Sequence, residues 1–385
     1  MTSRIMTRAI RKRRSSSRVS SGTAGPLSIA RQGWFFVGGR HVKGAGGTYM
    51  AGQMYVEFQI PARCTHPYPI VMWAGNGQSG CNFTGTPDGR EGWAQYFLRR
   101  GYAVYIVDQP GRGRSGYYTD VCGVQSVQHI SAVEARFTAP ARSKLWPQGR
   151  RHTQWPGSGV AGSAAFDQFY ASQLPSIQDQ HLSQSLNRDA GAALLDRIGP
   201  AILLTHSQSG TYGWLVADAR PRQVKAIVAV EPSGPPVYDT PLKHGKRVKP
   251  WGLTWEPLRY APAAASARQL VFERQKQPDG KDLMQCWLQK APARRLANLS
   301  RIPVVILTGE ASYHAPFDHC TARYLEQAGV PTTFIRLADR GIRGNGHMMM
   351  LERNNLEIAA LIDTWLDRHV ARPGRKPKAR RPRRR

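Results

Sequence analysis

The most informative run of the sequence is Ala201-Ile202-Leu203-Leu204-Thr205-His206-Ser207-Gln208-Ser209-Gly210. An apolar run of strand length leads directly into a turn of small residues, and a segment compatible with a helix follows from Thr211 to Ala219. A strained turn between a strand and a helix holds a hydroxyl group clear of its own backbone. The stretch therefore predicts that Ser207 is a nucleophile, although a buried strand followed by a serine-rich turn fits the same residues.

Small residues flank this serine on both sides, as the close approach of strand and helix requires. The usual motif is G-x-S-x-G. This chain has Thr205 and Ser209 at the two glycine positions, so it departs from that pattern.

Two later segments supply the partners that a nucleophilic serine needs. Residues 226–230 form an apolar, β-branched run that is typical of a buried strand, and Glu231 follows directly. His347 ends a glycine-rich loop and precedes a helical pattern from Met348 to about His369. The chain order Ser207, Glu231, His347 gives a nucleophile, an acid and a general base.

A glycine-rich loop after an early strand is a candidate for oxyanion binding. The apolar residues 69–74 predict a strand, and Gly75-Asn76-Gly77-Gln78-Ser79-Gly80 follows it. Backbone N–H groups in such a loop, together with that of the residue after the nucleophile, stabilise a developing negative charge on oxygen. We expect Gln208 and Asn76 to be the donors, with Gly77 as the next choice.

Further runs resemble the α/β-hydrolase superfamily. They are Thr86-Pro87-Asp88-Gly89-Arg90, the segment Asp108-Gln109-Pro110-Gly111-Arg112-Gly113-Arg114-Ser115 after a strand, and Val230-Glu231-Pro232. Together they resemble a bacterial and fungal serine-esterase branch, in which the catalytic glutamate follows the strand after the nucleophile. The resemblance covers roughly Gln32 to Val370. It implies a serine hydrolase that acts on carboxylic esters, with Ser207, Glu231 and His347 as the triad.

The identity of the acid is open at this stage. Many α/β-hydrolases place it one strand later, and here residues 302–309 form that strand. Ser312 stands near the position where an aspartate is expected, and Glu310 and Asp318 are the alternatives. We favour Glu231. The role of the acid is the same in either place, since a buried carboxylate fixes the imidazole tautomer and stabilises the imidazolium.

The composition predicts one large α/β domain. The chain has 385 residues, of which 41% are hydrophobic, and strands alternate with helical stretches, which favours a mainly parallel twisted sheet flanked by helices. We assign residues 25–370 to this domain, with lid-like insertions at about 116–199 and 232–300. The sequence contains no apolar run of the roughly 18 residues that would span a membrane.

Basic residues crowd both ends of the chain, which carries a formal net charge of +29. Residues 1–24 and 371–385 are therefore predicted to be disordered basic tails. They are compatible with weak, non-specific contacts to nucleic acid or an anionic surface, or with tails that only increase solubility.

The sequence shows no secretory signal, so a cytoplasmic location is expected, although the basic N-terminus also resembles a transit sequence. The five cysteines show no metal-ligand spacing, and free thiols are expected unless the protein is exported, when one disulfide is possible. No cofactor or metal is predicted, and a homodimer is compatible with the sequence.

The function that these patterns predict is cleavage of a carboxylic ester through an acyl-enzyme on Ser207. The alternatives are an acyltransferase or another chemistry of the same fold. A nucleic-acid or membrane-surface binding protein with basic tails ranks last, because a pure binding protein has no use for the triad.

Overall fold

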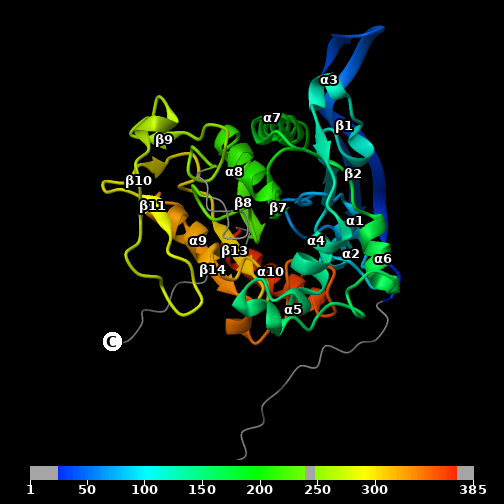
Figure 1. Ribbon diagram of the computed structural model, residues 1–385. Helices are drawn as coiled ribbons and strands as arrows, with labels where there is room; N and C mark the ends of the chain where they lie inside the picture. Colours follow the sequence, from blue (N-terminus) through cyan, green and yellow to red (C-terminus); the bar gives the residue numbers. More distant parts are fainter. Residues whose placement is uncertain (1–24, 239–247, 371–385) are drawn as a thin grey trace, which may run out of the picture.

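A twisted sheet of eight strands forms the centre of the computed structural model, which describes residues 25–238 and 248–370 (Figure 1). The order of the strands across the sheet is β1-β2-β4-β3-β7-β8-β13-β14. Their bounds are β1 Ile29–Gly44, β2 Gly47–Pro61, β3 Ile70–Trp73, β4 Val104–Asp108, β7 Ala201–His206, β8 Val224–Val230, β13 Val304–Thr308 and β14 Thr332–Arg336. The predicted basic tails lie outside the described residues.

The direction of the strands confirms the predicted fold class. β2 runs antiparallel to both of its neighbours, β1 and β4, whereas the pairs from β4 to β14 are all parallel. Every residue of β3, β7 and β13 is buried. Parallel strands covered on both faces have this continuous apolar character.

Successive side chains of each strand enter two different cores, because they point to opposite faces of the sheet. Met72 and Leu204 join one core with helices α2 (Trp93–Arg99) and α10 (Asn355–His369). Val71 and Leu203 join the other core. Its helices are α7 (Gln180–Ile198), α8 (Ser209–Ala219) and α9 (Asp318–Gln327).

Within the first predicted insertion, at about 116–199, α7 packs against β1 and α8. Residues 116–179 contain only short elements. These are α3 (Thr119–Cys122), β5 (Gln125–Ser126), α4 (Ile130–Val133), the π-helical turn η2 (Glu134–Thr138), α5 (Pro140–Ser143), η3 (Pro147–Arg151), α6 (Ala164–Ala171) and β6 (Ser176–Ile177).

The second insertion contains short strands and turns in its described part. These are β9 (Tyr260–Ala261), η5 (Ala267–Gln269), β10 (Phe272–Arg274), β11 (Trp287–Gln289) and β12 (Arg295–Leu296). The remaining short helices lie elsewhere in the domain, at α1 (Cys81–Thr84), η1 (Gly113–Ser115) and η6 (Leu337–Arg340).

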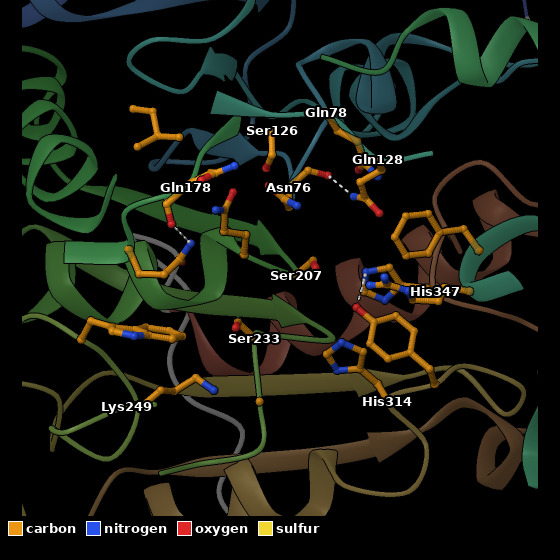
Figure 2. A pocket seen from close by; sticks show the side chains of 18 residues that line it. Asn76, Gln78, Ser126, Gln128, Gln178, Ser207, Ser233, Lys249, His314 and His347 are labelled. Atoms are coloured by element: carbon orange, nitrogen blue, oxygen red, sulfur yellow. Dashed lines mark hydrogen bonds between the residues drawn. The ribbon is translucent and has the colours of Figure 1, made fainter. Parts of the chain in front are cut away.

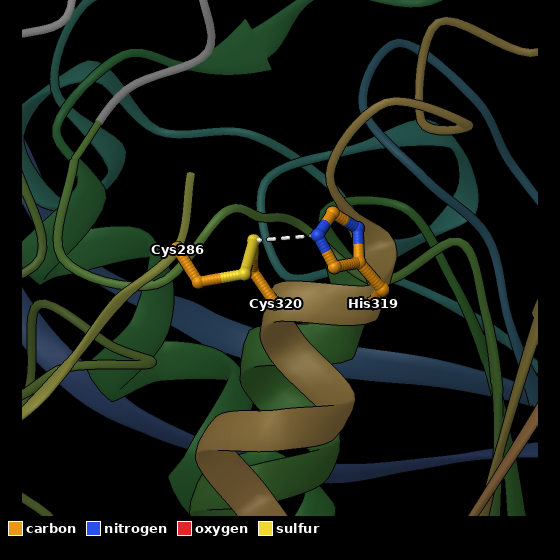
Figure 3. A group of neighbouring side chains, drawn as sticks. All are labelled: Cys286, His319 and Cys320. Carbon is orange, nitrogen blue, oxygen red and sulfur yellow. Dashed lines mark hydrogen bonds between the residues drawn. A yellow bond between two sulfur atoms is a disulfide. The ribbon is translucent and has the colours of Figure 1, made fainter. Parts of the chain in front are cut away.

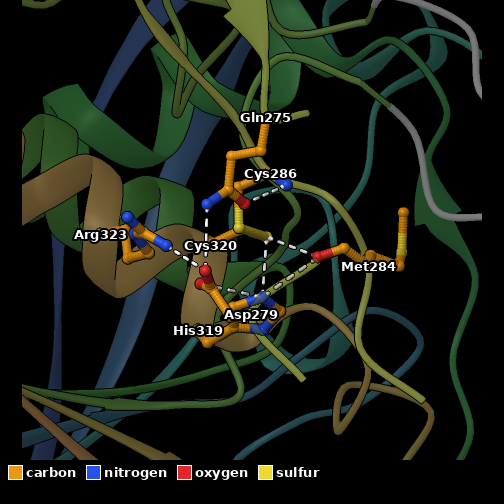
Figure 4. The surroundings of a disulfide bond; sticks show 7 residues. All are labelled: Gln275, Asp279, Met284, Cys286, His319, Cys320 and Arg323. Atoms are coloured by element: carbon orange, nitrogen blue, oxygen red, sulfur yellow. Dashed lines mark hydrogen bonds and ion pairs between the residues drawn. A yellow bond between two sulfur atoms is a disulfide. The ribbon is translucent and has the colours of Figure 1, made fainter. Parts of the chain in front are cut away.

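A disulfide between Cys286 and Cys320 attaches the second insertion to α9 (Figure 3). His319 lies beside it, and the surrounding contacts include an ion pair between Asp279 and Arg323 (Figure 4). The expectation of free thiols is therefore wrong for these two cysteines. Three others, Cys64, Cys81 and Cys122, are free.

Within the part of the chain that is described, no helix has both the length and the apolar composition needed to cross a membrane.

Candidate active site

Ser207 lies at the turn between β7 and α8, with a φ of +56°. This left-handed conformation is strained for a residue with a side chain. The backbone is fixed on both sides, because the N–H of Ser207 donates to Val230 O at 3.0 Å and its carbonyl accepts from Ser233 N–H at 2.8 Å. The strained turn presents the Ser207 side chain to a cavity (Figure 2).

The departures from the glycine motif have local explanations. Thr205 fits because the helix facing it carries a glycine, Gly213, at which an added Cβ would lie 3.0 Å from Thr205 Cγ2. Ser209 has a structural role, since its hydroxyl donates to Trp73 O at 2.7 Å and accepts from His206 N–H at 2.8 Å. The hydroxyl of Ser209 thus joins the turn to the end of β3.

His347 and Glu231 are brought together by the folding of distant segments. The His347 Nδ1 atom lies 2.5 Å from Glu231 Oε2, and both side chains are buried. Glu231 accepts two further hydrogen bonds, from Gly309 N–H to Oε1 at 2.7 Å and from the Ser312 hydroxyl to Oε2 at 2.6 Å. Ser312, which stands where an aspartate was considered, therefore supports the glutamate.

The two alternative acids lie in other contacts. Glu310 accepts a hydrogen bond from Gly344 N–H at 3.0 Å and forms an ion pair with Arg343 at 3.3 Å. Asp318 lies 2.7 Å from His314 Nδ1 and accepts a hydrogen bond from the Thr308 hydroxyl. Neither carboxylate forms a hydrogen bond with His347 in the described structure.

The loop that carries His347 is held by Glu352, which the sequence analysis did not identify. This buried carboxylate accepts hydrogen bonds from Gly346 N–H at 2.9 Å and from the Asn345 side chain at 2.7 Å. His152 contacts it from the first insertion at 2.7 Å. Glu352 lies five residues after His347 in the sequence, but only the tertiary structure shows which groups it binds.

Burial shifts the acid–base properties of the pair. It lowers the pKa of His347 well below the usual 6.5, and nearby His206 and His314 act in the same direction. Burial also raises the pKa of Glu231 well above 4.5, with a further contribution from the negative charge of Asp318. Removal from water disfavours the charged form of each group.

Aromatic rings surround the imidazole of His347. The rings of Phe137 and His314 stack on it, with centroid distances of 5.2 Å and 4.9 Å. The Tyr313 hydroxyl lies 3.5 Å from His347 Nε2, and Tyr313 lines the cavity together with Ser207. Tyr313 therefore lies within reach of both residues, a position that the sequence alone did not reveal.

The predicted oxyanion loop lies beside Ser207. No hydrogen bond within the described ranges takes up the N–H of Asn76 or of Gln208. The N–H of Gly77, in contrast, donates to Ser176 Oγ at 2.8 Å. The N–H of Gly77 is thus not free to donate to an oxyanion in this conformation, so the structure does not support Gly77 as an oxyanion donor.

A buried arginine fixes both parts of this region. Arg112 Nη1 donates to Gly75 O at 2.7 Å, and Nη2 donates to Gln208 Oε1 at 3.1 Å. Burial lowers the pKa of Arg112 to about 10. An arginine that remains protonated throughout the neutral range thus connects the loop to the residue after Ser207.

The cavity in front of Ser207 has a volume of about 440 Å³. Figure 2 shows Ser207 in the middle, with His347 and His314 on one side and Lys249 toward the other. Six amide side chains contribute to the lining, namely Asn76, Gln78, Gln128, Gln178, Gln180 and Gln208. His206 does not line the cavity, and its Nε2 lies 3.1 Å from His347 O.

Among the described residues, histidine, cysteine and carboxylate side chains come together in groups that resemble metal sites, but the atoms that would bind a metal take part in other contacts. In one group the two cysteines form the disulfide beside His319. In another, Glu231 and His347 are hydrogen-bonded to each other and His314 contacts Asp318.

Comparison with known proteins gives consistent matches over most of the chain. Residues 70–361 match the sequence profile described as "Alpha/beta hydrolase family". The chain is 48% identical over 326 residues to the probable secreted lipase phiG of a fungal species (strain ATCC 74256), which is 84% of this chain and 88% of that protein. A solved structure of a novel bacterial esterase has a TM-score of 0.65 at 27% identity, covering 92% of this chain and 100% of that chain.

One prediction is contradicted by these matches. The fungal relative is named as a secreted protein, which points to an extracellular rather than a cytoplasmic location. The N-terminal segment on which the cytoplasmic prediction rested lies outside the described residues.

Proposed function

Because the chain belongs to the alpha/beta hydrolase family and cleaves carboxylic esters, we propose that it does so through an acyl-enzyme on Ser207. One observation carries the proposal. The strained turn presents Ser207 to the cavity beside His347, whose Nδ1 atom lies 2.5 Å from the buried carboxylate of Glu231. A serine hydroxyl is a weak nucleophile until an adjacent base accepts its proton.

In the proposed reaction, His347 accepts the proton of Ser207 at Nε2 while the serine oxygen attacks the ester carbonyl carbon. The N–H groups of Gln208 and Asn76 donate hydrogen bonds to the carbonyl oxygen as its negative charge develops. His347 passes the proton to the departing alcohol, and the acyl group stays on Ser207. A water molecule then gives a proton to the same imidazole and attacks the acyl carbon. The bond to Ser207 breaks, His347 returns the proton to the Ser207 oxygen, and the carboxylic acid leaves.

Glu231 has two roles in this scheme. Its contact with Nδ1 fixes the tautomer that leaves Nε2 free to accept a proton, and its charge stabilises the imidazolium that forms in the transition state.

We also propose that the protein acts outside the cytoplasm. The Cys286–Cys320 disulfide supports this location, since disulfides persist in oxidising compartments and are rare in the cytosol. The name of the fungal relative is a second, independent indication.

The test of the proposed nucleophile is hydrolysis of 4-nitrophenyl esters of increasing acyl length by the wild type and by Ser207→Ala. We expect kcat to fall by roughly 10⁴-fold or more, as it does when the serine of a comparable triad is removed. Ser266→Ala is the matched control, because Ser266 is exposed and does not line the cavity. Unchanged turnover in Ser207→Ala would exclude the acyl-enzyme on this residue.

A further inference from the structure

The cavity in front of Ser207 is lined mainly by polar groups. Besides the six amide side chains, it contains the hydroxyl groups of Ser126 and Ser233. Phe137, Ile177 and Trp255 are its main apolar contributors. A site for a long acyl chain would be lined mostly by apolar side chains, because burial of the chain supplies the binding energy. The lining therefore favours a polar substrate.

The charged side chains of the lining have one sign. Arg136 and Lys249 both contribute to it, and no aspartate or glutamate of residues 25–238 or 248–370 does. The whole chain is also strongly basic, with 54 lysines and arginines against 25 aspartates and glutamates. A concave site lined by one sign of charge attracts ligands of the opposite sign.

Of the two cations that line the cavity, Arg136 is the one whose charge acts on the side chains near Ser207. It is half-buried in the π-helical turn η2, next to Phe137, whose ring stacks on His347. Arg136 lines the cavity together with His347 and Tyr313, and its positive charge lowers the pKa of both of these side chains. Among the described residues, no carboxylate forms an ion pair with it.

Lys249 lies on the other side of Ser207 (Figure 2). Its amine donates to Pro235 O at 3.0 Å and lies 5.1 Å from the centre of the Trp255 ring. These contacts engage the ammonium group within the wall of the cavity. Arg136 is therefore the stronger candidate for direct contact with a ligand.

The position of Arg136 relative to His347 indicates which part of an ester it would meet. His347 must deliver a proton to the departing alcohol oxygen, so the alcohol part of the ester lies on the His347 side of Ser207. Tyr313 and His314 contact His347, and Arg136 directly precedes Phe137, whose ring stacks on His347. Lys249 and Gln178 lie away from His347 (Figure 2).

We propose that the substrate is an ester whose alcohol part carries a negatively charged group, and that the guanidinium of Arg136 binds this group. A planar guanidinium forms paired hydrogen bonds with a carboxylate. The inference rests on the proposed function, since it takes the direction of the departing alcohol from the roles of Ser207 and His347.

The test compares two acetate esters that differ in one group of the alcohol part. The first is 4-acetoxybenzoate, whose departing alcohol carries a carboxylate, and the second is 4-acetoxybenzamide, which is neutral and has nearly the same shape. For each enzyme variant, the quantity measured is the ratio of kcat/KM for the anionic ester to that for the neutral ester. Comparing this ratio between variants removes the intrinsic difference in reactivity between the two esters.

We expect Arg136→Gln to lower this ratio by about 10- to 100-fold, the range for a lost charge-assisted hydrogen bond. Arg136→Lys should retain part of the preference, because it keeps the charge. Arg222→Gln is the matched control, since Arg222 is exposed and lies just before β8, away from the cavity. It should leave the ratio unchanged.

A second pair of esters tests the placement of the charge. The 4-nitrophenyl monoester of glutaric acid carries its carboxylate on the acyl part, and 4-nitrophenyl butyrate is its neutral counterpart. If Arg136→Gln lowers the ratio only for this pair, the charge belongs on the acyl part and the placement is wrong. If the ratio changes for neither pair, Arg136 does not bind an anion.

Inhibition by the alcohol products supplies a measurement that does not depend on turnover of these esters. We expect 4-hydroxybenzoate to inhibit the wild type more strongly than 4-hydroxybenzamide, and Arg136→Gln to remove the difference. Equal inhibition of the wild type would contradict the inference. Failure of the proposed function would look different, because ester hydrolysis by the wild type would then not depend on Ser207.

Discussion

Glu231 is a fully buried carboxylate, and each of its oxygens accepts at least one hydrogen bond. The groups that bind it come from three separate segments, at Gly309, Ser312 and His347. An isolated buried carboxylate would be very unfavourable, so these contacts keep the charged form available to His347. The sequence indicated where Glu231 lies along the chain, but not that a serine near the usual place of the acid would bind it.

Replacement of the two candidate acids separates their roles. We expect Glu231→Gln to lower kcat for a neutral ester by roughly 10²- to 10⁴-fold, because the amide cannot fix the required tautomer or stabilise the imidazolium. Glu310→Gln should have a much smaller effect, since Glu310 contacts Gly344 and Arg343 instead of His347. Steady-state kinetics of both variants measures the difference, and a larger loss in Glu310→Gln would reverse the assignment.

The pH dependence of catalysis follows from the lowered pKa of His347. Burial and the nearby His206, His314 and Arg136 disfavour the protonated imidazole, whereas contact with Glu231 favours it. Catalysis requires the neutral form, so activity is lost as the pH falls through this lowered pKa. We therefore expect the acid limb of kcat/KM to lie below pH 6.5.

This expectation is checked by the kcat/KM profile of a neutral ester between about pH 4 and about pH 8, under conditions in which the protein stays folded. An acid limb clearly above pH 6.5 would show that the negative charge of Glu231 outweighs the burial of His347.

The elements with continuous apolar character were predicted well. Strands were expected at 201–206 and 226–230, and β7 and β8 occupy these positions. The last helix begins at Asn355 instead of Met348. Residues 348–350 are three methionines that form turns and whose side chains are buried in the core. A helical pattern of buried residues does not by itself distinguish the two arrangements.

Long-range pairing explains what the sequence did not show. The long β1–β2 hairpin, which extends from the body in Figure 1, was not predicted; it is closed by a short turn between Gly44 and Gly47, whereas the pairing of β2 with β4 joins more distant residues. The roles of Tyr313, Arg136 and Glu352 were not predicted either, because they depend on contacts between residues that are far apart in the sequence. Each lies in an irregular or short segment whose partners are brought near only by the tertiary fold.

The oxyanion loop approaches Ser207 so closely that only glycine fits at its first position. A Cβ added at Gly75 would lie 2.9 Å from Ser207 Cβ and 3.1 Å from His206 Nδ1. We expect Gly75→Ala to move the loop and lower kcat by roughly 10- to 100-fold, because small misplacements of catalytic groups are costly. Gly280→Ala is the control, since its Cβ would make only ordinary contacts. Equal activity of both variants would argue against the predicted loop position.

The disulfide should stabilise the second insertion against the body of the domain. It closes a loop with a sequence separation of 34 residues, for which the chain-entropy relation gives about 3–4 kcal/mol. We expect the double variant Cys286→Ser/Cys320→Ser to lose this amount of unfolding free energy in urea. Cys64→Ser, at an exposed free cysteine, should show no comparable loss. A double variant as stable as the wild type would mean that the bond does not constrain the unfolded chain.

At the scale of the whole molecule, buried histidines make the folded state sensitive to acid. Burial lowers the pKa of His206 to about 3, so the folded protein takes up this proton far less readily than the unfolded chain below pH 6.5. The unfolded state binds more protons in this range, and stability therefore falls as the pH decreases from 6.5 toward 3.

For His206 alone the loss is about 2–3 kcal/mol between pH 7 and pH 4.5. We expect the stability measured by denaturant unfolding to fall less between these pH values in His206→Gln, which cannot take up a proton, and the difference from the wild type to be about this amount. The same pH dependence in both proteins would assign the acid sensitivity to other groups.

Covalent labelling shows whether Ser207 is the activated nucleophile of an esterase. The wild type and Ser207→Ala are treated with a fluorophosphonate, and intact mass and peptide mapping locate the adduct. We expect one adduct on the wild type, on the peptide that contains Ser207, and none on the variant. Equal labelling of Ser207→Ala, or an adduct at another serine, would contradict this expectation.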